Sequence, residues 1–321
     1  MGDLLEVAVS DSGELVVRFV VPGFVDDDER VSGGNVYDRR LRDGLRGLGL
    51  EVVLLPLPVS GATELPGALS LLPDDALVLV DGLLAVAVAA AEALTAESSR
   101  LRLVLLAHMV ASRLIEGDEG GQSAVARERA VLAAAWRIIA TSRWTRSELI
   151  TLGADPERVV VAPPGTDSAD ASTGSESGAA RLLCVGAIAP HKGQDVVVEA
   201  LAELASVPGW TCEFVGSLTA EPAFAARLEA EVTARGMADR ISFTGVAVGA
   251  TLDAAFAEAD LVIAASRVES YGMAVAEALA RAIPVLTTDA GGSRRRSRTR
   301  PPESPYRRAT ARRSPTPSGA G

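Results

Sequence analysis

The chain alternates short runs of Val, Ile and Leu with longer segments rich in Ala, Leu and Glu. Short apolar runs separated by helical patterns are typical of parallel sheets wrapped by helices. In the first half the apolar runs predict strands at 15–21, 51–57, 76–81, 101–107, 137–140 and 158–161. The segments between them predict helices at 34–48, 83–97, 123–135 and 143–152. Together these elements predict a Rossmann-like domain over residues 1–163.

A stretch rich in Ser, Gly, Pro and Asp interrupts this pattern at 164–178, and such a composition is typical of an interdomain linker. The alternation then resumes, with strands predicted at 181–185, 211–215, 240–244, 261–264 and 284–287. Helices are predicted at 194–205, 221–235, 251–258 and 273–280. We therefore predict the α/β class, with a second Rossmann-like domain at 179–292 that faces the first across a cleft.

The pattern stops after Gly292. Residues 293–321 contain no Val, Ile, Leu, Met, Phe or Trp, and carry nine Arg and one Glu. Such a segment cannot bury enough apolar surface to offset its ordering entropy, so we predict a disordered basic tail. The whole chain still has a net charge of -11, which makes the body acidic and argues against a nucleic-acid partner. The arginines of the tail favour peripheral contact with an anionic membrane.

Two further features bear on location and metal binding. The longest apolar run, 83–91, is too short to span a bilayer, and the acidic N-terminus lacks a signal-peptide pattern, which predicts a cytoplasmic protein. Cys184 and Cys212 lie in apolar strand segments without metal-type spacing, which predicts buried reduced thiols.

Two glutamates lie on either side of Gly272: Glu269 follows the strand at 261–264, and Glu277 lies in the first turns of the helix at 273–280. Open α/β sheets bind ligands at the carboxyl ends of their strands. A carboxylate beside a helix N-terminus can accept hydrogen bonds from sugar or ribose hydroxyls, while the helix N–H groups face a phosphate. A lone Glu on an Ala-rich helix would indicate only a solvated surface, so the interpretation depends on the spacing of the pair.

Two glycine-containing loops and one histidine also occupy strand ends. Gly33 and Gly34 open the first long helix, where a bare backbone and free N–H groups suit a diphosphate. Gly186 and the pair Lys192-Gly193 follow the strand at 181–185, and Lys192, the only lysine of the chain, suits the β-phosphate of a nucleotide. His108 ends the strand at 101–107, where it either binds a sugar hydroxyl or has a structural role.

The passage from Glu269 to Glu277 resembles the E-x7-E signature of retaining, nucleotide-sugar-dependent glycosyltransferases of family 4, which have the GT-B fold. The loop from Gly186 to Gly193 resembles the V-G-R-x4-K-G motif of that family, except that Ala187 stands where many members carry an Arg that contacts the diphosphate. The resemblance extends from about residue 14 to Gly292.

The resemblance implies retaining transfer of a hexosyl group from a UDP- or GDP-sugar to a glycan, lipid or small-molecule acceptor, with no cofactor and no bound metal. It places Glu269 at the donor-sugar hydroxyls, Glu277 at the ribose, Lys192 at the diphosphate and His108 at the sugar. The implied catalytic residues are His108, Lys192 and Glu269. The implied donor-binding residues are Gly33, Gly34, Gly186, Lys192, Gly193, Glu269, Ser270, Tyr271, Gly272 and Glu277.

Two alternatives remain open. Family members continue beyond Gly292 with further helices, so the Arg/Pro/Ser tail leads us to expect a truncated or frame-shifted chain, with an incomplete second domain. Such a chain could be inactive or misfolded and at most bind a nucleotide-sugar. A nucleotide-sugar 2-epimerase has the same fold, but it would need more acidic and histidine residues at the strand ends than a chain with two His provides.

Overall fold

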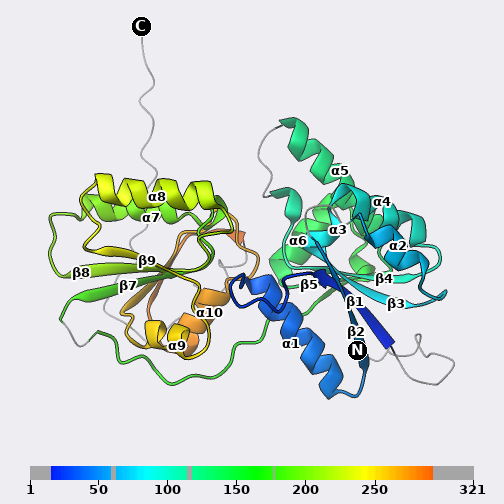
Figure 1. The fold of residues 1–321 in the computed structure, drawn as a ribbon, viewed down its shortest axis with the longest axis horizontal. Helices are drawn as coiled ribbons and strands as arrows, with labels where there is room; N and C mark the ends of the chain where they lie inside the picture. Colours follow the sequence, from blue (N-terminus) through cyan, green and yellow to red (C-terminus); the bar gives the residue numbers. More distant parts are fainter. Residues whose placement is uncertain (1–15, 59–62, 114–117, 176–177, 292–321) are drawn as a thin grey trace, which may run out of the picture.

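The computed structural model describes residues 16–58, 63–113, 118–175 and 178–291, so the predicted basic tail lies outside the described residues. Two separate parallel sheets form the framework (Figure 1). The first has the strand order β2-β1-β3-β4-β5-β6. Its strands are β1 Val16–Pro22, β2 Glu51–Leu57, β3 Leu77–Asp81, β4 Arg102–Ala107, β5 Arg137–Ala140 and β6 Val159–Val161.

Helices cover both faces of this sheet, because its strands are apolar on both sides. Side chains alternate along β1: Phe19 belongs to a core that packs against α1, and Val20 belongs to the core on the opposite face. The helices are α1 Gly33–Gly47, α2 Leu65–Ser70, α3 Gly82–Ala85, α4 Val88–Glu97, α5 Asp118–Ala134 and α6 Arg143–Leu152. Apart from α1, the helices contribute to the core containing Val20 or lie beside it (Figure 1).

The second sheet has the order β11-β10-β7-β8-β9 and is also parallel throughout the described pairs. Its strands are β7 Ala180–Val185, β8 Trp210–Val215, β9 Ile241–Gly245, β10 Leu261–Ala264 and β11 Val285–Thr287. One face packs against α7 Gln194–Glu203 and α8 Pro222–Ala234, around Phe214 and Leu228. The other packs against α9 Ala250–Ala257 and α10 Met273–Ala280, around Phe256 and Ala278.

The predicted linker has a defined course along the second unit. The Ser172 N–H donates to the carbonyl of Arg281 at 2.8 Å, and the Gly174 N–H donates to that of Ala257 at 3.2 Å. Asp260 accepts hydrogen bonds from the N–H groups of Ser175 and Arg181 at 2.9 and 2.8 Å. This segment is therefore fastened to α9, to the end of α10 and to the start of β7, although its composition alone indicates only a flexible connection.

The structure differs from the predicted helices at two places. The helix predicted at 83–97 is two helices, because Ala87 adopts an extended conformation between α3 and α4. The six-residue α2 was not predicted, and its sequence contains Pro66 and Gly67, which disfavour a helix interior. Among the described residues, no helix is long and apolar enough to cross a membrane.

Candidate functional site

The glycine loop at the start of α1 lies between the two halves of the molecule. Ser32 caps the helix by accepting a hydrogen bond from the Asn35 N–H at 3.2 Å. A Cβ placed on Gly33 would lie 3.1 Å from the Met273 sulfur, at the first residue of α10. A Cβ on Gly34 would lie 3.4 Å from the His108 ring. The loop thus approaches α10 of the second unit on one side and the end of β4 on the other.

Lys192 and Glu269 form an ion pair in the second unit. The Lys192 Nζ lies 3.0 Å from Oε2 of Glu269, and Ser266 Oγ donates to the same oxygen at 3.2 Å. The other carboxylate oxygen accepts the Gly272 N–H at 3.1 Å. The aliphatic part of Lys192 passes close to Gly186, whose absent Cβ would lie 3.8 Å from it. The loop after β7 and the loop after β10 are therefore joined through their charged side chains.

These contacts fix the charge state of Glu269. Burial would raise the pKa of its carboxyl group, but the charge of Lys192 and the hydrogen bonds from Lys192, Gly272 and Ser266 hold that pKa below its usual value. Glu269 is consequently a carboxylate at neutral pH. Three donors already occupy it, which suits a group that orients hydroxyls and makes it a poor proton acceptor.

Gly193 is required where these loops meet. Its φ of +68° lies in the left-handed region, and a Cβ there would lie 2.1 Å from the Ala265 carbonyl oxygen. Only glycine permits this approach of the loop before α7 to the end of β10. The motif Lys192-Gly193 therefore combines a cation with a residue that the packing itself requires.

The remaining side chains of the 269–277 segment have different surroundings. Tyr271 Oη donates to the Pro164 carbonyl at 2.6 Å and so contacts the linker. Ser270 is buried, and its hydroxyl has no hydrogen-bond partner among the described residues. The Glu277 carboxylate, half-buried on α10, likewise has no ion-pair or hydrogen-bond partner within the described ranges. Burial raises its pKa, and the charges of Arg281 and Arg40 oppose that rise.

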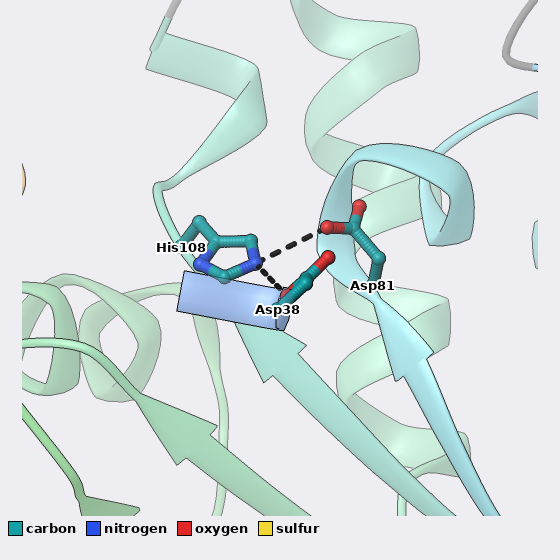
Figure 2. Close-up of side chains that lie close together, drawn as sticks. All are labelled: Asp38, Asp81 and His108. Carbon is teal, nitrogen blue, oxygen red and sulfur yellow. Dashed lines mark hydrogen bonds and ion pairs between the residues drawn. The ribbon is translucent and has the colours of Figure 1, made fainter. Parts of the chain in front are cut away.

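His108 has two partners that the sequence analysis missed. Its Nε2 lies 2.8 Å from Asp38 Oδ1 and 3.1 Å from Asp81 Oδ2 (Figure 2). Asp38 comes from α1 and Asp81 from the end of β3, next to β4, after which His108 follows directly. The sequence did contain a signal, because Asp81 ends the predicted strand at 76–81 and neighbouring parallel strands share one carboxyl edge. Asp38 had no comparable signal beyond its place four residues after Gly34.

Burial and charge oppose each other in this cluster. For His108, burial would lower the pKa, but the hydrogen bonds and charges of Asp38 and Asp81 raise it to about 10. Burial raises the pKa of Asp38 to about 7, with His108 opposing and Asp81 adding to the rise. For Asp81, the effect of burial is outweighed by His108, which lowers its pKa. Each of the three residues offers one metal-ligand atom, all within 4.8 Å of one another, and Nε2 of His108 is the atom that both carboxylates contact.

Two cavities lie at the edges where the strands begin, away from the carboxyl ends that carry the loops described above. One, of about 520 Å³, is bordered by residues at the starts of β4, β5 and β6, including Arg102 and Trp136. The other, of about 370 Å³, lies at the starts of β7, β8 and β9. Neither contains any of the residues at the carboxyl ends of the strands. We therefore place the candidate site where the loops converge at the carboxyl ends of the strands, and we do not choose it by the size of a cavity.

Comparison with protein families supports the motifs found in the sequence. The family described as "Glycosyl transferases group 1" matches residues 166–296, and "Glycosyltransferase Family 4" matches residues 76–170. A D-inositol 3-phosphate glycosyltransferase of Kineococcus radiotolerans is 35% identical over 63% of this chain and 52% of its own length. The enzyme of that name from Nocardia farcinica is 34% identical over 62% of this chain and 49% of its own. The chain therefore spans about half the length of these curated relatives.

Solved structures show the same fold at low sequence identity. Sucrose-phosphate synthase from Thermosynechococcus elongatus superimposes with a TM-score of 0.71 and 18% identity, over 86% of this chain and 82% of that one. WaaG, a glycosyltransferase involved in lipopolysaccharide biosynthesis, gives 0.63 and 19%, over 88% and 83%. Anabaena HepE in complex with UDP-glucose gives 0.59 and 18%, over 87% and 82%. With both family matches and two parallel Rossmann-like sheets, the chain belongs to the group 1, family 4 glycosyltransferases of the GT-B fold.

Proposed function

We propose that this protein transfers a hexosyl group, with retention, from a UDP- or GDP-sugar to an acceptor. One observation carries the proposal. The Lys192–Glu269 ion pair lies beside the N-terminus of α10, and the bare backbone of Gly33 approaches that same helix end. A cation, helix N–H groups and glycine backbone suit a diphosphate, and a fixed carboxylate suits the hydroxyls of the attached sugar.

In this proposal each unit has a separate task. The unit at 179–292 binds the donor: Lys192 and Gly193, with Gly186, Ser270, Tyr271 and Gly272 around them, surround the diphosphate and the sugar. Glu277 has a carboxylate without a hydrogen-bond or ion-pair partner in the described parts of the chain, and it accepts the ribose hydroxyls. The unit at 1–163 supplies His108 and the glycine loop of Gly33 and Gly34, and it binds the acceptor, with residues 164–178 as the connection.

The mechanism follows from where charge develops. As the sugar–phosphate bond breaks, negative charge accumulates on the departing diphosphate, and Lys192 and the α10 N–H groups lie where they would stabilise it. Glu269 is held as a carboxylate, which orients the sugar and stabilises positive charge at the anomeric carbon. The proposal assigns no protein nucleophile, in keeping with attack by the acceptor from the face that the diphosphate leaves.

The comparisons suggest which substrates to try first. HepE was solved with UDP-glucose, and the curated relatives are named D-inositol 3-phosphate glycosyltransferases. We therefore propose a UDP-hexose as donor and a phosphorylated polyol as the first acceptor to be assayed. GDP-sugars and glycan or lipid acceptors form the comparison set.

Because Lys192 is the only lysine, the proposal has a direct chemical test. The purified protein is acetylated with an amine-reactive ester, and the rate of modification at Lys192 is followed by peptide mass spectrometry. UDP-glucose at ten times its Kd should slow this modification about tenfold, in proportion to occupancy. The N-terminal amine is an internal control whose rate should not change. Equal rates at Lys192 with and without every UDP- and GDP-sugar would contradict donor binding here.

Transfer is then assayed as nucleotide release with and without acceptor. Lys192→Met, which also removes the acetylation site, should reduce release, because the charge that stabilises the leaving group is lost. An exposed side chain on α7, changed as Glu199→Gln, serves as the control and should leave both the protection of Lys192 and the release unchanged. Donor binding without release would favour the alternative of an inactive nucleotide-sugar-binding protein.

A further inference from the structure

Among the residues that the structure describes, the surroundings of His108 leave one edge of its ring without a hydrogen-bond partner. Asp38 and Asp81 both face Nε2 (Figure 2). Gly34 lies beside Cδ2, and the Tyr37 ring meets the imidazole edge to face, with centroids 5.3 Å apart. Nδ1 forms no hydrogen bond with any residue in the described parts of the chain. The side chain is 13% exposed, so the ring is enclosed by protein over most of its surface.

The backbone on either side of the ring is also held. Thr141, after β5, donates through its hydroxyl to the His108 carbonyl at 3.0 Å. Glu128 of α5 accepts the N–H groups of Ala111 and Ser112 at 2.9 and 3.1 Å, which holds the segment that follows. The imidazole is therefore fixed from three directions: through its main chain, through the following turn and through Nε2.

The two aspartates differ in how they are held. Asp81 caps α3, because its Oδ1 accepts the N–H groups of Leu83 and Leu84 at 2.6 and 3.3 Å, which leaves Oδ2 for His108. Asp38 is 1% exposed, and its Oδ2 is buried with no hydrogen-bond partner among the described residues. A buried carboxylate in that state is costly unless a nearby positive charge offsets it. A protonated His108 provides that charge.

We propose that Asp38 and Asp81 are positioning residues that keep His108 as an imidazolium, so that its Nδ1–H is a permanent hydrogen-bond donor toward the donor substrate. This inference rests on the proposed function. It assigns His108 the role of a fixed cation, which stabilises the sugar diphosphate, and it removes His108 from the candidates for a general base. The raised pKa of His108, about 10, agrees with the geometry. The titratable groups facing the ring are Asp38 and Tyr37 from α1 and Asp81 from β3.

The first test needs no substrate, because the chain has only two histidines. Protein with ¹⁵N-labelled histidine is titrated by NMR from pH 5 to 9, and a His191→Gln variant assigns the two rings. For His191, burial and the charge of Lys192 lower the pKa to about 4, so that ring should be neutral at pH 7. We expect His108 to keep protons on both nitrogens throughout. A neutral His108 ring at pH 7 would overturn the proposal.

The second test is a pH profile of Asp81→Asn. Asn remains a good N-cap, so α3 is retained, and thermal melting checks the fold. The pKa of His108 should then fall toward about 6.5, leaving roughly 1% imidazolium at pH 8.5. We expect the rate of sugar transfer by the variant to approach the wild-type rate at pH 6 and to fall by up to about a hundredfold at pH 8.5. In the wild type, titration of His108 should change the rate little over this range. Equal pH profiles would overturn the role, because a purely structural aspartate would lower the rate at every pH.

Two outcomes separate this inference from its alternatives. A metal ion that stays with the purified protein, is lost in Asp38→Asn and shifts the His108 Nε2 resonance would overturn the inference, since a metal would occupy the position of the shared proton. If no UDP- or GDP-sugar is turned over, the proposed function fails. The pH dependence of Asp81→Asn is then measured as its affinity for UDP, by calorimetry. A pH-dependent loss of UDP affinity in Asp81→Asn would still support the imidazolium, and an unchanged affinity would contradict it.

Discussion

At the scale of single residues, the candidate site contains carboxylates that are paired and one, that of Glu277, without a partner among the described residues. Glu269 has Lys192, Ser266 and the Gly272 N–H around it, whereas Glu277 lies half-buried with its pKa raised by burial. Keeping an unpaired carboxylate partly out of water disfavours the folded state. A residue of this kind is expected where a ligand supplies the missing hydrogen bonds.

We therefore predict opposite effects of Glu277→Gln on binding and on stability. UDP affinity should fall about tenfold, because hydrogen bonds to a charged acceptor contribute about 1.5–3 kcal/mol. Because the pKa of Glu277 is raised in the folded state, ionisation of its carboxyl group lowers the free energy of unfolding as pH increases. Gln does not ionise, so the free energy of unfolding near pH 8 should stay equal or rise slightly. Calorimetry and thermal melting measure the two quantities. Glu199→Gln, on the exposed face of α7, should change neither.

His108 should give the stability a distinctive pH dependence. Its folded pKa of about 10 exceeds the unfolded value, so the folded state holds a proton that the unfolded state releases. This stabilisation is complete below the unfolded pKa and is lost as pH rises toward 10. Between pH 7 and 9 the free energy of unfolding of the wild type should decrease by more than about 1 kcal/mol. Denaturant unfolding should show a weaker decrease for His108→Gln in the same window, and an equal slope would contradict the assignment.

The sequence reveals some of these residues and not others for a physical reason. The positions of Glu269, Glu277 and Lys192 beside strand ends and helix starts could be predicted, because each stands at a fixed offset from such an end in the sequence. Asp38 could not, because its contact with His108 spans 70 residues and depends on how α1 lies over the sheet. The Lys192–Glu269 pair, 77 residues apart, was expected only as two separate ligand contacts.

At the scale of elements, the strands were predictable because parallel strands buried on both faces are continuous apolar runs. The predicted bounds of 51–57, 137–140 and 261–264 are those observed. The break between α3 and α4 was not predictable, since the run at 83–91 is uniformly apolar and gives no period that would reveal an extended residue. α2 is stabilised by packing, with Leu65 and Leu69 fully buried, and not by its own propensity.

The junction between the β7 and β10 loops gives a sharp prediction. Gly193→Ala should destabilise the protein by more than about 3 kcal/mol, because it adds a clash with the Ala265 carbonyl to the cost of a left-handed φ. Gly209→Ala is the matched control: its φ is +80°, and a Cβ there meets no atom within 4 Å, so only about 1–2 kcal/mol should be lost. Denaturant unfolding measures both. Equal losses would show that the close approach of the two loops contributes nothing.

At the scale of the whole molecule, the two units meet where α1 and α10 both begin. Gly33 approaches Met273 directly, Tyr271 donates a hydrogen bond to the linker at Pro164, and Arg40 of α1 pairs with Asp167 of the linker. The start of α10 in one unit thus lies against the glycine loop of the other. In the proposed function, the diphosphate would enter between these two helix N-termini.

A disulfide between the helix starts tests that arrangement. In a Gly33→Cys/Met273→Cys variant the two side chains should cross-link under mild oxidation, because the absent Cβ of Gly33 would lie 3.9 Å from Cγ of Met273, the position that a Cys sulfur would take in the same rotamer. Cys184 and Cys212 are buried and should not compete. Leu48→Cys/Met273→Cys is the control, since Leu48 lies at the far end of α1, about 20 Å from Gly33 along the helix.

Bound nucleotide should slow this cross-link. If the diphosphate lies between the glycine loop and the α10 N-terminus, saturating UDP would keep the two cysteines apart, and the rate should fall about tenfold at ten times Kd. Non-reducing electrophoresis follows the cross-linked fraction over time. Cross-linking that proceeds at the same rate with UDP bound would place the diphosphate away from Gly33, and the glycine loop would then be only a close packing contact with α10. A slowed reaction would locate the phosphates between the two helices, where the positive ends of both helix dipoles and Lys192 act on the same leaving group.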